Sequence, residues 1–161
     1  MKTVRITVAV LAASALLAQV RFDYIVRNDF FAGFAGNAEA LKRGMDTTER
    51  VLAGNPNHPE ALVWHGGGGL FQSGLEFQKG NFQKGAELMQ KATAEMDRAV
   101  ELAPDNIGVR IPRGASLMTA TQQMPDSPER RLLIERALSD YQRAFDLQHN
   151  QLDRMGTHPL G

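Results

Sequence analysis

Residues 64–74 read WHGGGGLFQSG, and this stretch decides the fold because its four consecutive glycines allow two opposite interpretations. They form either an oxyanion loop, whose free backbone N–H groups stabilise a developing negative charge, or part of a closely packed helix. Each glycine inside a helix costs about 1 kcal/mol relative to alanine, so four of them cost roughly 3–4 kcal/mol. A helix here therefore requires close contacts that offset this cost.

The residues around the glycines favour the helix. A His-Gly-Gly-Gly oxyanion loop in an esterase follows a strand and serves a serine on a Gly-x-Ser-x-Gly turn, and the chain has no such turn. The nearest stretch, GASLM at 114–118, ends in methionine within a helical pattern. His58-Pro59, ahead of the glycines, is typical of a helix start. We therefore predict a helix in which Gly66 allows close packing, while Gly67–Gly69 mark packing, a kink or the floor of a ligand groove.

Apolar residues recur at three- and four-residue steps along most of the chain, which predicts an all-α fold. Short breaks rich in glycine, asparagine and proline separate the helices and imply antiparallel helical hairpins. The predicted helices cover residues 22–34, 38–54, 59–78, 81–102, 109–123 and 128–147.

Composition excludes several classes of function. The 161 residues suit one domain, and 18 basic residues balance 18 acidic ones, without the basic excess of a nucleic-acid-binding protein. The absence of cysteine excludes disulfides, a thiolate zinc site and a cysteine nucleophile. His58 and His65 lie two helical turns apart but lack a third zinc ligand, and no carboxylate pair has the spacing of an acid/base couple. We expect no enzymatic activity, no metal and no cofactor.

The first 18 residues are typical of a secretory signal peptide. Lys2 and Arg5 precede an apolar run, Ile6–Ala18, which is shorter than the about 20 residues that span a bilayer. Cleavage after Ala18 would leave residues 19–161 and a formal charge of about −2, because two basic residues are lost. We predict an exported protein, periplasmic or secreted, with no stable membrane span after cleavage; an uncleaved anchor is the alternative.

Three segments repeat one pattern: ERVLAGNPN (49–57), DRAVELAPDN (97–106) and QRAFDLQHN (142–150). Their arginines, Arg50, Arg98 and Arg143, lie 48 and then 45 residues apart. The same register aligns Gly66 with Gly114, Ala92 with Ala137, and His65 with Arg113. Such a period is typical of stacked helical hairpins.

The pattern resembles the tetratricopeptide-repeat (TPR) family over about residues 37–150. The matching parts are Gly66 in the first helix, the turn Gly80-Asn81-Phe82, Ala92 and Ala99 in the second helix, and Pro104 at the exit. The helices are longer than in the family, whose repeat has about 34 residues. The resemblance implies a short α-solenoid that binds a peptide or partner protein on a concave surface lined by its first helices; a plain helical bundle is the alternative.

By that resemblance, an apolar groove with a polar rim binds the partner. The predicted groove residues are Val63, His65, Gly67, Leu70, Arg110, Ile111, Arg113 and Met118. The second hypothesis is an all-α enzyme or small-ligand-binding protein with its site around His65, Gly66–Gly69, Arg110 and Arg113. The two arginines could together bind a carboxylate, but an internal ion pair with a neighbouring helix is favoured.

The end of the chain resembles the linker into another first helix. QLDRMGTHPLG at 151–161 is similar to NHPEAL at 57–62. Solenoids need a closing element with a polar outer face. We therefore expect an incomplete repeat domain, or self-association through the open C-terminal end.

Overall fold

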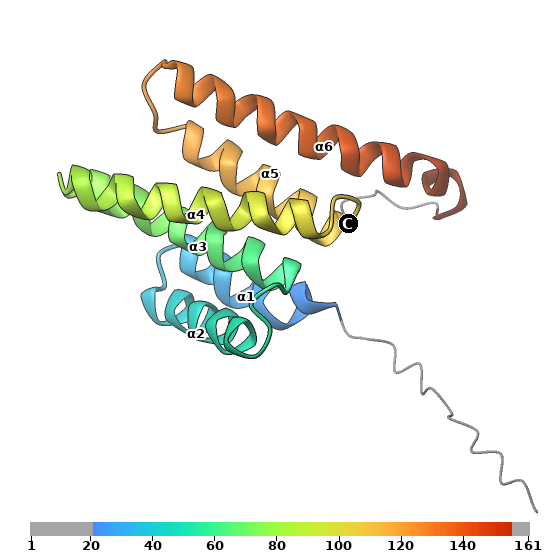
Figure 1. Ribbon diagram of the computed structural model, residues 1–161, viewed down its shortest axis with the longest axis horizontal. Coiled ribbons are helices and arrows are strands. Elements are labelled where there is room, and N and C mark those ends of the chain that lie inside the picture. The colour runs from blue at the N-terminus through green and yellow to red at the C-terminus, as the bar shows by residue number, and fades with distance from the viewer. Residues whose placement is uncertain (1–20, 156–161) are drawn as a thin grey trace, which may run out of the picture.

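The computed structural model describes residues 21–155, which form six α-helices and no strand (Figure 1). The all-α prediction is therefore confirmed. The helices are α1 (Phe22–Phe34), α2 (Ala38–Gly54), α3 (Pro59–Gln78), α4 (Phe82–Leu102), α5 (Ile107–Thr121) and α6 (Pro128–Met155). The predicted signal peptide, residues 1–18, lies outside the described residues, and so does the chain after Met155.

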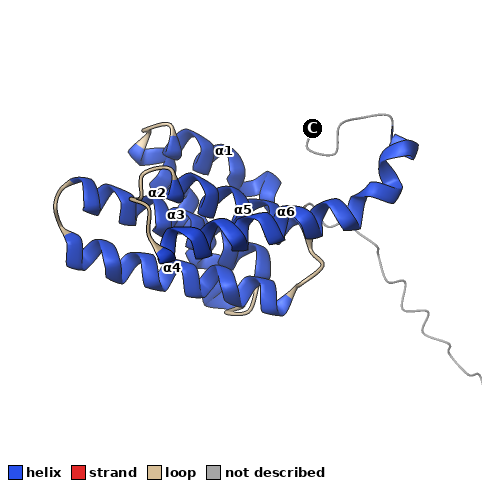
Figure 2. Ribbon diagram, turned by 90° about the horizontal axis from the view of Figure 1, so that it is seen from above, coloured by secondary structure: helices blue, strands red, loops and turns tan. Residues whose placement is uncertain are grey.

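Local sequence signals explain where the helices begin and turn. The Asn37 side chain accepts a hydrogen bond from the Ala40 N–H at 3.0 Å, and His58 Nδ1 accepts one from the Ala61 N–H at 3.2 Å. These side chains satisfy helix N–H groups that have no partner within the helix. Gly80, between α3 and α4, has φ of +79°, which glycine adopts without steric cost. Such caps and turns allow the short loops between the helices (Figure 2).

The helices pair in sequence as three hairpins: α1 with α2, α3 with α4, and α5 with α6. Figure 1 shows the hairpins stacked in order, with α3 and α4 in the middle of the stack. Helix α3 also contacts α1, α2 and α5. No helix among residues 21–155 combines the length and apolar character needed to cross a bilayer.

Helix α3 runs without a break through the four glycines. Each glycine faces different neighbours. A Cβ on Gly66 would lie 2.7 Å from the Ala92 carbonyl oxygen of α4, and one on Gly69 would lie 3.3 Å from the Ala92 Cβ. A Cβ on Gly67 would lie 2.8 Å from Ser116 Oγ of α5. The one on Gly68 would collide with Phe30 and Met45. Because α3 contacts helices of all three hairpins, glycines on several of its sides allow close approach.

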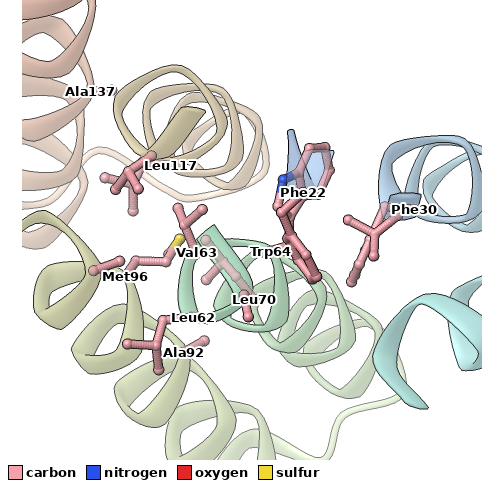
Figure 3. Close-up of a cluster of buried hydrophobic side chains, with 14 of the residues drawn as sticks. Phe22, Phe30, Leu62, Val63, Trp64, Leu70, Ala92, Met96, Leu117 and Ala137 are labelled. Atoms are coloured by element: carbon pink, nitrogen blue, oxygen red, sulfur yellow. The ribbon is translucent and has the colours of Figure 1, made fainter. Parts of the chain in front are cut away.

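The repeat register correctly predicts a contact in the third hairpin. A Cβ on Gly114 of α5 would lie 3.3 Å from the carbonyl oxygen of Ala137 in α6, as Gly66 lies against Ala92. The core fills the space between the hairpins (Figure 3). Val63 points toward Leu117 and Met96, whereas Trp64 points toward Phe22 and Phe30.

Four predicted boundaries were wrong. Helix α4 begins at Phe82 rather than at residue 81, and helix α5 ends at Thr121 rather than at residue 123. Helix α5 begins at Ile107 rather than at residue 109, because the Asn106 side chain accepts a hydrogen bond from the Gly108 N–H at 2.8 Å. Helix α6 continues to Met155 rather than ending at residue 147. No glycine or proline interrupts the chain between Pro128 and Gly156, so no local signal stops this helix earlier.

Candidate partner-binding groove

A groove of about 1070 Å³ runs over the first helices of the three hairpins, α1, α3 and α5. Its lining is mostly apolar and includes residues from α4 and α6 at its edges. The residues that line the groove include Gly67, Leu70 and Gly74 of α3 and Ile111 and Ala115 of α5. Gly67, Gly74 and Ala115 have small side chains or none, and this leaves room in the groove between α3 and α5.

Aromatic side chains of α1, α3 and α4 line the groove, and we call this set the aromatic wall: Tyr24, Phe31, Phe34, Trp64, Phe71, Phe77 and Phe82. Phe31 of α1 is 60% exposed and Phe82 at the start of α4 is 70% exposed, although both are large and apolar. The Phe31 ring lies 6.0 Å from the Trp64 ring, and the Phe82 ring lies 6.4 Å from the Phe77 ring. Contiguous exposed apolar surface of this kind marks interaction sites in soluble proteins.

One end of the groove carries an excess of positive charge. Arg21 and Arg27 share the single carboxylate of Asp23, at 3.1 and 3.9 Å. The Arg27 guanidinium also lies 4.4 Å from the centre of the Tyr24 ring, within the range of a cation–π contact. Two cations with one anion leave this end suited to an acidic group.

Three of the eight predicted groove residues line the groove: Gly67, Leu70 and Ile111. Val63 does not, because it is fully buried between α3 and α5. Met118 packs against the core rather than lining the groove. The binding role of the lining residues stays a prediction.

His65 does not line the groove either. A residue two positions from Gly67 lies about 200° around the helix, on its other side. There His65 Nδ1 lies 2.6 Å from Glu95 of α4, and His65 Nε2 lies 3.6 Å from Glu49 of α2. The hydrogen bond with Glu95, assisted by the charges of both glutamates, raises the pKa of His65 above its ordinary value of 6.5.

Arg110 and Arg113 form internal ion pairs with Asp140 of α6, as the sequence favours. Arg113 Nε lies 2.6 Å from the fully buried carboxylate of Asp140, and Arg110 lies 2.7 Å from the same carboxylate. Arg113 also reaches Asp97 at 2.9 Å, and Asp97 is 3.0 Å from Arg136. The network joins α4, α5 and α6, and neither arginine lines the groove.

The residues of the alternative site do not surround one cavity. His65 and Arg113 face acidic residues of the second helices, while Gly66 and Gly69 pack against α4. Within residues 21–155, no three His, Asp or Glu side chains are arranged to hold a metal ion. The geometry thus gives no support to a catalytic or ligand site at this position.

Sequence reasoning missed the aromatic wall. Tyr24, Phe31 and Phe34 lie in α1, which precedes the region that resembles the TPR family. The signal was present in residues 22–34, where FDYIVRNDFFAGF contains more aromatic residues than one buried stripe of a helix needs. An excess of this kind indicates a second apolar surface.

Comparisons with protein-family models, curated proteins and solved structures find no match to this chain. The resemblance to TPR proteins therefore stays a prediction from the repeat register of the sequence.

Proposed function

We propose that this chain is an exported, TPR-like interaction module whose groove binds an apolar segment of a partner protein. The observation that carries the proposal is the exposure of Phe31 and Phe82 toward a single groove over the first helices. Large aromatic side chains beside small residues are typical of the centre of a protein interface. The resemblance supports the proposal, because TPR-like arrays bind partners on the surface that their first helices line.

The groove also suggests the chemistry of the bound segment. Helix α3 is 20 residues long, which corresponds to about 30 Å of helix, so the groove offers room for a helical or extended segment of comparable length. Its walls accept large apolar side chains, as in recognition of an amphipathic helix by a hydrophobic groove. The Arg21–Arg27 end favours an acidic residue at one end of that segment.

The test is a selection of displayed peptides of about 20 residues against the immobilised protein, followed by affinity measurements on two variants. Ala115→Arg places a large charged side chain in the groove, where Ala115 is exposed. Ala94→Arg makes the same change at an exposed position of α4 that does not line the groove.

We expect Ala115→Arg to weaken binding of the selected peptides about tenfold or more, as the loss of a central contact does, and Ala94→Arg to leave it unchanged. Thermal unfolding of both variants serves as the control that they remain folded. Equal affinity of the peptides for Ala115→Arg and the unmodified protein would reject the groove as the binding surface.

A further inference from the structure

Two clusters of charged side chains occupy equivalent positions in the repeat and join successive hairpins. In the first, His65 of α3 contacts Glu95 of its own hairpin at 2.6 Å and Glu49 of the preceding hairpin at 3.6 Å. A basic side chain on a first helix thus lies between acidic side chains of two second helices.

The second cluster has the same arrangement with arginine in place of histidine. Arg113 of α5 contacts Asp140 of its own hairpin at 2.6 Å and Asp97 of the preceding hairpin at 2.9 Å. Arg113 follows His65 by 48 residues, and Asp97 follows Glu49 by 48 residues. Asp140 follows Glu95 by 45 residues, which is the spacing of the later pair of repeats. The clusters are therefore repeat equivalents.

The chemical difference lies in the number of protons. Arginine stays charged at any physiological pH and has five N–H donors, so Arg113 serves both carboxylates permanently. Protonated histidine has two N–H donors, one for each carboxylate, but neutral histidine has only one. When His65 loses a proton, it can serve only one of its two glutamates.

The geometry indicates which contact is lost. Glu95 is closer to His65 and only 20% exposed, whereas Glu49 is farther away and 61% exposed. Neutral His65 therefore keeps its proton on Nδ1, facing Glu95. The lone pair of Nε2 then faces the Glu49 carboxylate, and the contact changes from attraction to repulsion.

We propose that the contact between the first and second hairpins is a proton-controlled joint. Protonated His65 holds Glu49 of α2 against α3, and neutral His65 releases it, while Arg113 keeps the second and third hairpins joined at any physiological pH. Phe31 of α1 packs against Trp64 of α3 with ring centres 6.0 Å apart, and α1 pairs with α2, so release of α2 loosens the groove at this aromatic contact.

The charged groups that face His65 are Glu49 of α2 and Glu95 and Lys91 of α4. The pKa of His65 is raised, chiefly by its hydrogen bond with Glu95, and this outweighs the lowering by burial and by Lys91. A raised pKa in the folded state means that the stabilisation is complete below pH 6.5 and is lost as the pH rises through the pKa of the folded protein. The joint is thus closed below the pKa of His65 in the folded protein and released above it.

Amide hydrogen exchange of the full chain tests this inference, at about pH 5.5 and about pH 8.5, with rates corrected for the intrinsic effect of pH. We expect the opening equilibrium of α2 peptides to rise about two- to fivefold at the higher pH, the range for a partly exposed ion pair, and that of α6 peptides to stay constant.

His65→Arg copies the third hairpin and should keep α2 protected at both pH values. Glu49→Gln alters an exposed side chain, so the fold is expected to survive, and it should also abolish the response of α2 to pH. Equal responses of α2 and α6, or a full response of α2 in Glu49→Gln, would overturn the proposal.

Discussion

In the second and third hairpins the two helices pack in a similar way, but different interactions hold them together. In the second, Gly66 brings α3 so close to α4 that a Cβ would lie 2.7 Å from the Ala92 carbonyl oxygen. In the third, the equivalent distance from Gly114 to the Ala137 carbonyl oxygen is 3.3 Å. The third hairpin instead places the fully buried carboxylate of Asp140 between two arginines.

This difference teaches that equivalent positions of the repeat form helix contacts in both hairpins, although different interactions stabilise those contacts. Where the backbones approach most closely, dispersion and burial between small residues help to hold the pair, beside the hydrogen bond between His65 and Glu95. Where they are farther apart, hydrogen-bonded charges connect the helices and fix their register, as buried polar groups do in some helical assemblies. The two hairpins should therefore respond to opposite kinds of substitution.

The largest effect is expected from Asp140→Ala. It leaves Arg110 and Arg113 without their shared buried partner, which typically costs about 3–5 kcal/mol of the free energy of unfolding. The control is Asp105→Ala, which removes the exposed pair of Asp105 with Arg143 and should cost no more than about 1 kcal/mol. Urea unfolding measures both, and similar losses would show that the buried network does not hold the third hairpin.

The next effect separates crowded from uncrowded glycines of the same helix. Gly66→Ala inserts a methyl group against backbone that cannot move aside, and we expect a loss of about 1–3 kcal/mol. Gly74→Ala, also within α3, meets no atom within 4 Å and should stabilise the protein by about 0.5–1 kcal/mol.

Gly114→Ala sharpens the comparison, because its nearest neighbours include the Tyr141 ring, which can move by a few tenths of an ångström. Its effect on the free energy of unfolding should fall between those of Gly66→Ala and Gly74→Ala. A stability loss as large as that of Gly66→Ala would mean that the two hairpins are packed equally tightly.

The smallest effect is expected in acid, at the turn of the second hairpin. Hydrogen bonds from Asn81 and then Lys79 lower the pKa of Glu76 to about 2. A lowered pKa in the folded state gives stabilisation that is present above pH 4.5 and is lost as the pH falls toward 2. Glu76→Gln should therefore flatten this part of the stability profile, whereas Glu87→Gln, at an exposed position of α4, should leave it unchanged. An unaltered acid profile in Glu76→Gln would contradict this assignment.

Local signals in the sequence predicted most of the fold. Asn37, His58-Pro59 and Gly80-Asn81 mark helix ends by capping or turn chemistry, which acts within a few residues. The repeat register also predicted that Gly66 and Gly114 would occupy equivalent packing positions. The end of α6 was predicted too early, although no glycine or proline stands between Pro128 and Gly156 to stop the helix at residue 147.

The groove was harder to predict for a physical reason. A helical pattern shows which residues share a face, but α3 has neighbours on several sides, so the pattern alone could not tell Val63, which faces α5, from Gly67, which lines the groove. His65 and Arg113 form ion pairs between helices, with Glu95 and Asp140, and the sequence alone does not identify these partners. The aromatic wall depends on α1, where the repeat pattern does not extend.

The most direct test of the central claim compares two phenylalanines of similar exposure on different surfaces. Phe31 in the groove is 60% exposed, and Phe145 on the outside of α6 is 55% exposed and does not line the groove. Calorimetric titration with a peptide selected on the unmodified protein should show about tenfold weaker binding to Phe31→Ala and unchanged binding to Phe145→Ala. Unchanged binding to Phe31→Ala, or an equal loss in both variants, would contradict the account.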